Sequence, residues 1–392
     1  MRFINFLTYS TVYIIASFVL MSFSTTAMAG IFDFGGNQDN IAPHEKTIGA
    51  MIPLTGKHKN LGEMISRSVT MAWYDYAPKD LKLNIYDTQS SREGAISGYE
   101  KASINNAKII VGPLTGDNTK TIANYNRGSI INLSLTNNPA YGQSNIMIMG
   151  YTPQSQGIAI SKILEYKDFN RAVILVPDNK FGNAVIEGIG FFGGNRIVHT
   201  VYYPPNAEDF KDLAKYLVKN KSYYDYDAII LSDGNPKTIR ILAAQLAYYD
   251  AQDPHIDLQD TSSIQKKIQI PMIGGLGWYA LNGAYKEPPL LNGYYIRIPN
   301  TPRKAVFDEK YKELYGKKPT PLARLAYDIM ALSIVTTNHD DPIKKLTQKH
   351  GFSGISGIFK ISDYGMVTRD YHIMKVRRTK SVYASTVSVQ NQ

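Results

Sequence analysis

Few side chains in this sequence have the types and spacing that catalysis or metal binding requires. There is no cysteine, which excludes thiol catalysis, disulfides and thiolate metal sites. The seven histidines are scattered, without the short spacings that direct two ligands to one metal. Neither the G-x-S-x-G turn of serine hydrolases nor a phosphate-binding P-loop occurs. We therefore expect no enzyme, no metal and no cofactor.

One glycine pattern, GIGFFG at residues 188–193, has the spacing of a dinucleotide-binding loop. Such a loop must follow a strand and open a helix. Here the pattern closes an expected helix and precedes an expected strand. We interpret it as a helix end and a turn.

Polar residues do gather where two expected strands end. The apolar run 109–111 stops at Gly112-Pro113 and is followed by a polar loop, 114–118. After an expected helix, a second strand, 130–133, ends in the polar loop 134–138. In open parallel sheets, loops at the carboxyl ends of strands face the binding crevice. This βαβ unit therefore predicts a binding crevice beside these two loops.

Trp278 and Tyr279 follow a third expected strand, after the segment Gly274-Gly275-Leu276-Gly277. They are either packing residues near a hinge or aromatic walls of a cleft. The sequence leaves both interpretations open.

The elements that position these loops repeat one pattern along the chain. Strands are expected at 47–52, 81–86, 109–111, 130–133, 171–176, 196–203, 227–231, 268–273 and 294–298, with helices between most of them. This alternation indicates parallel sheets of the α/β class, and about nine such units are too many for one sheet. We predict two doubly wound parallel-sheet lobes. Near the end of the chain, 357–360 and 371–376 are expected to pair as antiparallel strands.

Composition sets broad limits on function. A chain of 392 residues, 44% hydrophobic and 19% charged, is long enough for two domains with ordinary cores. The formal net charge is +10, but the basic residues are scattered. Scattered charge favours a solvated surface over a nucleic-acid patch, so we expect no nucleic-acid partner.

Residues 1–29 have the organisation of an export signal. Arg2 supplies the positive end, Val12 to Phe23 an apolar run, and Ala27-Met28-Ala29 a cleavage site. The apolar run is shorter than the roughly 20 residues that span a bilayer. We expect cleavage after Ala29, no remaining membrane span, and a mature protein in the periplasm. Residues 30–45 are expected to form a flexible leader.

From Lys46 to Val376 the chain resembles a known family. Its segments TIGAMIPLTGKHKNLGE, YDTQSSREGA, KIIVGPLTG, VPDNKFG, PMIGGLGW, LNGYYIRIP, FDEKYKELYGKKPTPLARLAYDIMALS and GIFKISDYG are similar, in this order, to type I periplasmic binding proteins of the leucine/isoleucine/valine class. The resemblance implies two lobes around a cleft, joined by a three-stranded hinge. The crossovers are expected near Gly150-Tyr151, Ile298-Pro299 and Gly357. The N-terminal lobe is then 46–150 and 299–356, the C-terminal lobe 151–298 and 357–380, and the tail 381–392.

The resemblance also implies where a ligand is held. In amino-acid receptors of this class, hydroxyl and N–H groups of two loops hold the carboxylate, an acid from the other lobe holds the ammonium, and aromatics cover the side chain. The matching positions carry Gly116, Leu135 and Asn137 for the carboxylate, Leu276 for the acid, and Leu61 and Phe181 for the aromatics. Only Phe181 keeps the expected type. If the alignment shifts by one residue, Thr115, Thr136 or Ser134 supplies a hydroxyl, but the acid stays absent.

A buried ammonium without a carboxylate costs several kcal/mol, so we expect no free amino acid as ligand. The chain is also similar, in DTQSSREGA and VGPLTG, to the binding-protein-like domain of outer-membrane lipoproteins that activate penicillin-binding proteins, although it lacks their lipid-bearing cysteine.

Two hypotheses remain. The first is a non-catalytic, partner-binding protein of cell-envelope assembly, with a penicillin-binding protein or another envelope protein as partner. The second is a receptor that delivers a small-molecule ligand from its cleft to an ABC permease. A leucine-lined cleft favours the first hypothesis, and converging polar groups favour the second.

Overall fold

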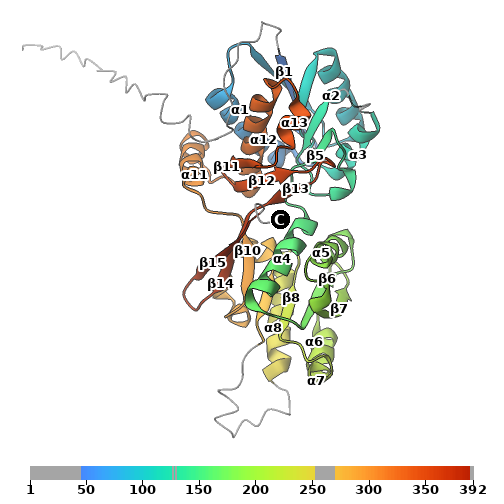
Figure 1. The fold of residues 1–392 in the computed structure, drawn as a ribbon, viewed down its shortest axis with the longest axis vertical. Helices are drawn as coiled ribbons and strands as arrows, with labels where there is room; N and C mark the ends of the chain where they lie inside the picture. The colour runs from blue at the N-terminus through green and yellow to red at the C-terminus, as the bar shows by residue number, and fades with distance from the viewer. Residues whose placement is uncertain (1–45, 126–127, 129, 252–269, 389–392) are drawn as a thin grey trace, which may run out of the picture.

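The computed structural model describes residues 46–125, 128, 130–251 and 270–388. The expected signal peptide, 1–29, and leader, 30–45, lie outside the described residues. Within the described part the chain forms two α/β lobes, one above the other in Figure 1, each built around its own sheet. The predicted fold class of two parallel-sheet lobes is confirmed.

The N-lobe is the upper one, and its sheet has the strand order β2-β1-β3-β4-β5, parallel throughout. Its first part comprises β1 (Lys46–Ile52), α1 (Lys59–Tyr76), β2 (Leu81–Asp87), α2 (Arg92–Ile104), β3 (Ala107–Val111), α3 (Gly116–Tyr125), β4 (Ile131–Ser134) and β5 (Ile146–Ile148). A later part adds α11 (Pro302–Tyr315), α12 (Pro321–Thr337), α13 (Pro342–Leu346), and a small sheet of β11 (Phe352–Gly354), β12 (Gly357–Ile361) and β13 (Val367–Arg369).

The C-lobe holds a seven-stranded sheet in the order β15-β14-β10-β9-β8-β6-β7. Its elements are α4 (Pro153–Lys167), β6 (Ala172–Pro177), α5 (Lys180–Gly190), β7 (Ile197–Tyr203), α6 (Lys211–Lys219), α7 (Lys221–Tyr224), β8 (Ala228–Leu231), α8 (Pro236–Ala251), β9 (Met272–Gly274), α10 (Leu276–Ala280), β10 (Tyr294–Arg297), β14 (Tyr371–Val376) and β15 (Ser381–Val387). Strands β14 and β15 run antiparallel to their neighbours. The GIGFFG segment ends α5 and forms the following turn, as predicted.

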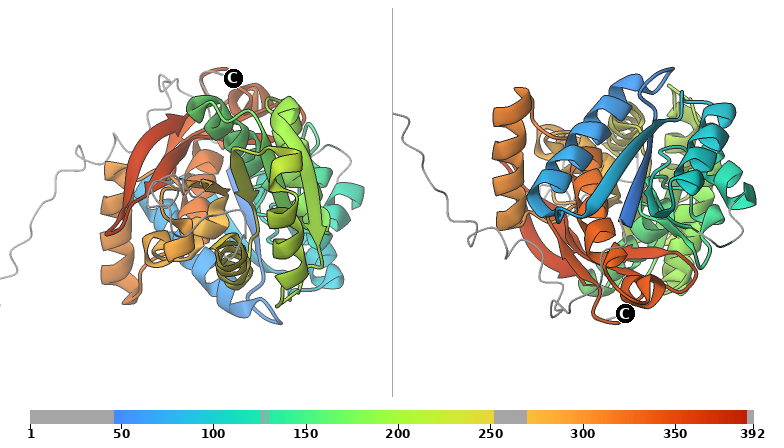
Figure 2. Two further views of the ribbon diagram at one scale, coloured as in Figure 1. Left: turned by 90° about the horizontal axis from the view of Figure 1, so that it is seen from below. Right: turned by 90° about the horizontal axis from the view of Figure 1, so that it is seen from above.

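Each sheet is covered on both faces, which explains the continuous apolar runs in its strands. Successive side chains of a strand point to opposite faces. Val173 and Leu175 of β6 therefore join one buried cluster, and Ile174 and Val176 join another. The same split separates Ile52 from Met51 in β1. Figure 2, which views the molecule from below and above, shows helices on both sides of the sheets.

The chain passes between the lobes between β5 and α4, between β10 and α11, and between β13 and β14. The third passage corrects the expectation of a crossover at Gly357, and with it the assignment of 357–380 to the C-lobe. Phe359, Ile361 and Val367, from β12 and β13, are buried in the N-lobe core. Gly357 has φ +102° and lies at the start of β12, where an added Cβ would be 2.8 Å from Pro299 Cγ. Gly357 is therefore a turn residue that lies close to Pro299, and the chain passes to the C-lobe later, after Arg369.

Two further expectations about the end of the chain are wrong. Strand 371–376 does not pair with 357–360, because β12 pairs with β13 and β14 pairs with β10 and β15. Most of the expected tail, 381–392, is the strand β15, which pairs with β14 from Ser381 to Val387. The side chain of Val387 is buried, so this segment is part of the C-lobe sheet.

Candidate functional site

The loops after β3 and β4 lie beside a hollow of about 500 Å³ on the N-lobe, next to the first crossover. We call it the apolar hollow. It is lined by Leu61, Met64, Leu114, Leu135, Asn137, Gly150, Tyr151, Thr320, Pro321, Leu322 and Leu325. The predicted loops and the N-terminal parts of α1 and α12 meet here, although they are far apart in sequence. No charged side chain is among these lining residues.

Three predicted site residues line the apolar hollow. Leu61, on α1, is 40% exposed, Leu135 is 4% exposed, and the side chain of Asn137 is exposed. Leu135 and Asn137 alternate with Thr136 along the loop after β4, which places them on the same side. The structure therefore brings three of the predicted positions together at one hollow.

The predicted hydroxyl residues are used inside their own loops. Thr115 Oγ1 accepts the N–H of Asn118 at 3.3 Å at the start of α3, and Thr136 Oγ1 accepts the N–H of Asn138 at 3.2 Å. Ser134 is fully buried, and its hydroxyl lies 2.7 Å from that of Thr119. Gly116 packs against this loop, since an added Cβ would lie 3.4 Å from Thr136 Oγ1. These groups shape the loops but do not line the hollow.

The predicted residues of the C-lobe are also apolar and half-buried. Phe181, near the start of α5, and Leu276, at the start of α10, pack against one cluster of the C-lobe core. The backbone N–H of Leu276 donates to Gln156 Oε1 at 3.0 Å. Leu276 occupies the position where the resemblance expected an acid.

Trp278 is not a cleft residue. Its side chain is fully buried in the C-lobe core, its indole N–H donates to the carbonyl of Leu231 at 3.0 Å, and its ring stacks with Tyr295. Of the two interpretations of this aromatic, packing is the one observed. The cause is local, because Gly274 leaves room for the indole directly against the backbone.

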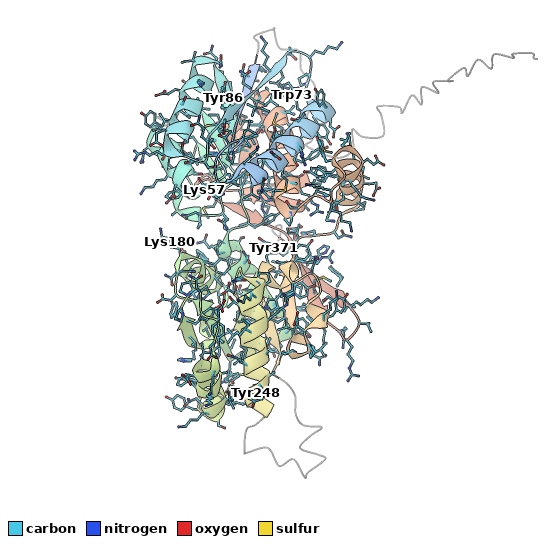
Figure 3. All side chains as sticks on the ribbon, turned by 180° about the vertical axis from the view of Figure 1, so that it is seen from behind. Lys57, Trp73, Tyr86, Lys180, Tyr248 and Tyr371 are labelled. Atoms are coloured by element: carbon cyan, nitrogen blue, oxygen red, sulfur yellow. The ribbon has the colours of Figure 1, made fainter. Side chains whose placement is uncertain are left out.

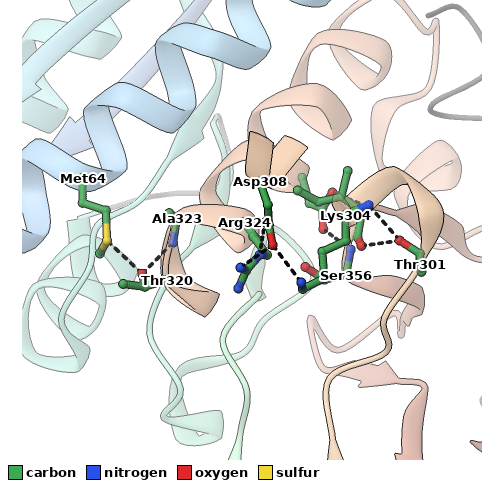
Figure 4. Close-up of polar contacts among 10 residues, drawn as sticks. Met64, Thr301, Lys304, Asp308, Thr320, Ala323, Arg324 and Ser356 are labelled. Atoms are coloured by element: carbon green, nitrogen blue, oxygen red, sulfur yellow. Dashed lines mark hydrogen bonds and ion pairs between the residues drawn. The ribbon is translucent and has the colours of Figure 1, made fainter. Parts of the chain in front are cut away.

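Sequence reasoning missed the residues that α12 contributes. Thr320 caps α12, accepting the N–H of Ala323 at 3.2 Å, and its hydroxyl donates to the sulfur of Met64 on α1 at 2.8 Å (Figure 4). Leu322 and Leu325 follow on the same helix. They had the apolar spacing of a core helix, and no signal in the sequence showed that this end of α12 meets α1.

The hinge contacts the apolar hollow through Tyr151. This side chain packs against the cores of both lobes. Arg369, at the last crossover, lies over the Tyr151 ring, 5.1 Å from its centroid, and donates to the carbonyl of Met149. Its guanidinium is 5.0 Å from the Phe359 centroid as well. One buried cation thus ties the first and third crossovers together.

A buried carboxyl holds a turn of the N-lobe near Arg369. Asp328, on α12, accepts the N–H groups of Ile355 at 2.8 Å and Ser356 at 3.2 Å, in the turn between β11 and β12. Burial raises the pKa of Asp328 to about 7, although these N–H groups and Arg369 act in the opposite direction. The residue holds a turn and has no open space beside it, since a Cβ on Gly354 would be 2.7 Å from its carboxylate.

Among the described residues, no group of three or more His, Asp or Glu side chains is arranged to hold a metal ion. No helix of the described ranges has both the length and the apolar character needed to cross a membrane. The residues that line the apolar hollow can make contacts with apolar groups and a hydrogen bond from Asn137.

Comparison with known proteins gives one family match, to the model described as periplasmic binding protein, over residues 45–381. A curated relative, the uncharacterized protein RP748 of Rickettsia prowazekii, is 24% identical over 241 residues, which are 57% of this chain. The match spans 64% of the length of that relative.

Several solved structures share the fold. A putative branched-chain amino acid ABC transporter protein of Rhodospirillum rubrum matches with a TM-score of 0.72 at 14% identity, covering 87% of this chain and all (100%) of that one. LivJ of Streptococcus pneumoniae, in complex with isoleucine, matches with a TM-score of 0.58 at 17% identity, covering 88% of this chain and 99% of that one. The LpoA C-domain of Haemophilus influenzae, described as a regulator of PBP1A, matches with a TM-score of 0.62 at 18% identity. The match covers 86% of this chain and 100% of that one. At these identities the likeness concerns the fold alone.

Proposed function

Because the chain belongs to the periplasmic binding protein family, we propose that it is a non-catalytic, periplasmic module that binds a partner protein of cell-envelope assembly. The partner class is a penicillin-binding protein or another envelope protein. The export signal expected at residues 1–29 supports the location. Among the proteins with this fold, the LpoA C-domain is the precedent for such a regulatory role.

The main support for this proposal is the lining of the apolar hollow. A free amino acid brings an ammonium and a carboxylate, and each needs a charged or hydrogen-bonding partner when it is buried. Leu276 is apolar, Leu135 lines the hollow, and neither Thr115 nor Thr136 is among the residues that line it. The leucine lining of the hollow supports a protein that does not transport amino acids.

A second function, receptor of an ABC importer, is favoured by the size of the apolar hollow and by its position at the hinge. A volume of about 500 Å³ is within the range of small-molecule sites. In this alternative the ligand is not a simple amino acid, and the partner is an ABC permease.

Chemical crosslinking of the full-length exported chain in envelope fractions, with identification of the captured proteins, tests the proposal. We expect capture of a penicillin-binding protein, absent from the sample without crosslinker. Capture of an importer permease instead would move the second function to first place.

A further inference from the structure

We propose that the apolar hollow binds an uncharged ligand that has an apolar body and a single hydrogen-bonding group. The inference rests on the proposed function, because it too treats the apolar hollow as a binding surface that does not hold free amino acids. It adds the class of ligand, which neither function specifies.

The lining determines the charge of the ligand. Leu61, Leu114 and Leu135 from the first part of the N-lobe line the hollow together with Leu322 and Leu325 from α12. No lining side chain carries a charge to compensate an ion, and burying an uncompensated ion costs far more than burying a neutral group. The walls therefore select a neutral molecule and contribute mainly by removing its apolar surface from water.

One polar group is free to orient such a ligand. Within the described residues the amide of Asn137 makes no hydrogen bond, and its side chain is exposed at the hollow. Two other lining residues have polar side chains. Thr320 is engaged with Met64 Sδ and the N–H of Ala323, and the hydroxyl of Tyr151 is buried below the surface of the hollow. A carbonyl, hydroxyl or amide of the ligand pairs with Asn137, which provides both a donor and an acceptor.

The ligand also contacts the hinge. Gly150 and Tyr151, which line the hollow, form the first crossover, and Tyr151 carries the guanidinium of Arg369 on its ring. Figure 3 shows Tyr371, the residue that begins β14 after the third crossover, at the level where the lobes meet. Its hydroxyl lies 2.9 Å from that of Ser155 at the start of α4. Occupation of the hollow thus acts directly on the segments that set the angle between the lobes.

Two fluorescent probes with the same ring system test the ligand class. N-Phenyl-1-naphthylamine is uncharged and has one N–H, and 8-anilino-1-naphthalenesulfonate adds a sulfonate to the same rings. With the full chain we expect saturable binding of the uncharged probe at one site per chain, at least tenfold tighter than the anion. Equal affinity for both, or no saturable binding of the uncharged probe, would overturn the proposal.

A matched pair of variants locates the site. Leu61→Glu places a charge in the wall of the hollow, and Leu314→Glu makes the same change at a 58% exposed leucine of α11, outside the hollow. Leu61→Glu should weaken the uncharged probe at least tenfold, and Leu314→Glu should leave it unchanged. Asn137→Ala, at an exposed side chain, should weaken it about threefold to tenfold, the loss of one hydrogen bond. Equal effects of the two glutamates would place the probe elsewhere and contradict the inference.

Competition with the probe distinguishes two kinds of uncharged ligand, one with a linear acyl chain and one with an aromatic ring. Decanamide represents a linear acyl chain and benzamide an aromatic ring, each with one amide. Displacement by either supports the proposal and names the source, and failure of both contradicts it. The crosslinking result is independent, because capture of a penicillin-binding protein without probe binding removes only this inference. Probe binding without such capture removes only the proposed partner.

Discussion

At the scale of single residues, the cleft differs from an amino-acid site by its missing charges. Leu276 occupies the position where the resemblance to amino-acid receptors implies an acid, and neither Thr115 nor Thr136 lines the apolar hollow. Removing one partner of a buried ion costs roughly 3–5 kcal/mol, and each 1.4 kcal/mol is about tenfold in affinity. A micromolar site would thus become millimolar or weaker.

Free amino acids should therefore leave the stability of the protein unchanged. Leucine, isoleucine, valine, alanine and glutamate, each at about 1 mM, should give no shift in melting temperature. A ligand at a hundredfold excess over Kd would add about 2.7 kcal/mol, which such an experiment detects readily. A rise of several degrees with any of the five would show that the positions carried over from the family are wrong.

Asp328 should make stability depend on pH. Its pKa, raised by burial to about 7, exceeds the ordinary value of 3.8, so the folded state binds the proton more tightly than the unfolded state. The contribution of this proton to stability is fully present below about pH 4 and is lost as the pH rises through about 7. Asp328→Asn should flatten the fall in melting temperature between pH 5 and pH 8.

The exposed Asp340→Asn serves as the control for this titration, because its side chain lies in solvent. It should melt like the unchanged protein at every pH. If Asp328→Asn shifts the melting temperature by the same amount at pH 5 and at pH 8, the carboxyl does not titrate in this range.

At the scale of elements, the sequence predicted the long apolar strands well and the short or half-exposed ones poorly. Runs such as 172–177 and 228–231 are buried on both faces and therefore continuously apolar. β15, with the sequence SVYASTV, is half-exposed and carries serines between its apolar residues, so its sequence indicates a tail rather than a strand. β13 has three residues, and this is too short for an alternating apolar pattern to mark it as the partner of β12. The hollow was found only in part, since α12 reaches it through tertiary packing.

Because β15 is a paired strand, removing it should destabilise the C-lobe. A chain that ends at Lys380 loses the partner of β14 and the buried side chain of Val387. Burial of one valine contributes about 1.5–3 kcal/mol, so the melting temperature should fall by at least about 4 °C. A chain that ends at Ser388 keeps β15 and should melt like the full chain. Equal melting of both truncated chains would contradict the assignment of β15 to the sheet.

At the scale of the whole molecule, the three passages between the lobes form a hinge, and binding between lobes of this kind is accompanied by closure. Lys57, in the loop after β1, and Lys180, at the start of α5, belong to different lobes and lie on the two sides of their boundary in Figure 3. Both side chains are exposed. Since the chain has no cysteine, two substitutions to cysteine give the only labelling sites.

Energy transfer between labels at Lys57→Cys and Lys180→Cys should increase when the apolar hollow is saturated with N-phenyl-1-naphthylamine. The pair Lys57→Cys and Lys101→Cys, both on the N-lobe, should show no change. An unchanged signal from the first pair at saturation would mean that occupation of the hollow does not close the lobes.

The late position of the third passage has a consequence for how the chain folds during synthesis. The N-lobe core includes Phe359, Ile361 and Val367, and the C-lobe sheet includes β14 and β15. Neither lobe can therefore complete its core or sheet before the residues after 350 are present. Domains generally fold as units as they emerge, but neither lobe here is complete until almost the whole chain has been synthesised. Until then, exposed strand edges on both lobes are open to aggregation. Chaperones should therefore stay bound through nearly all of synthesis, and a chain arrested near residue 350 should remain sensitive to protease in both lobes.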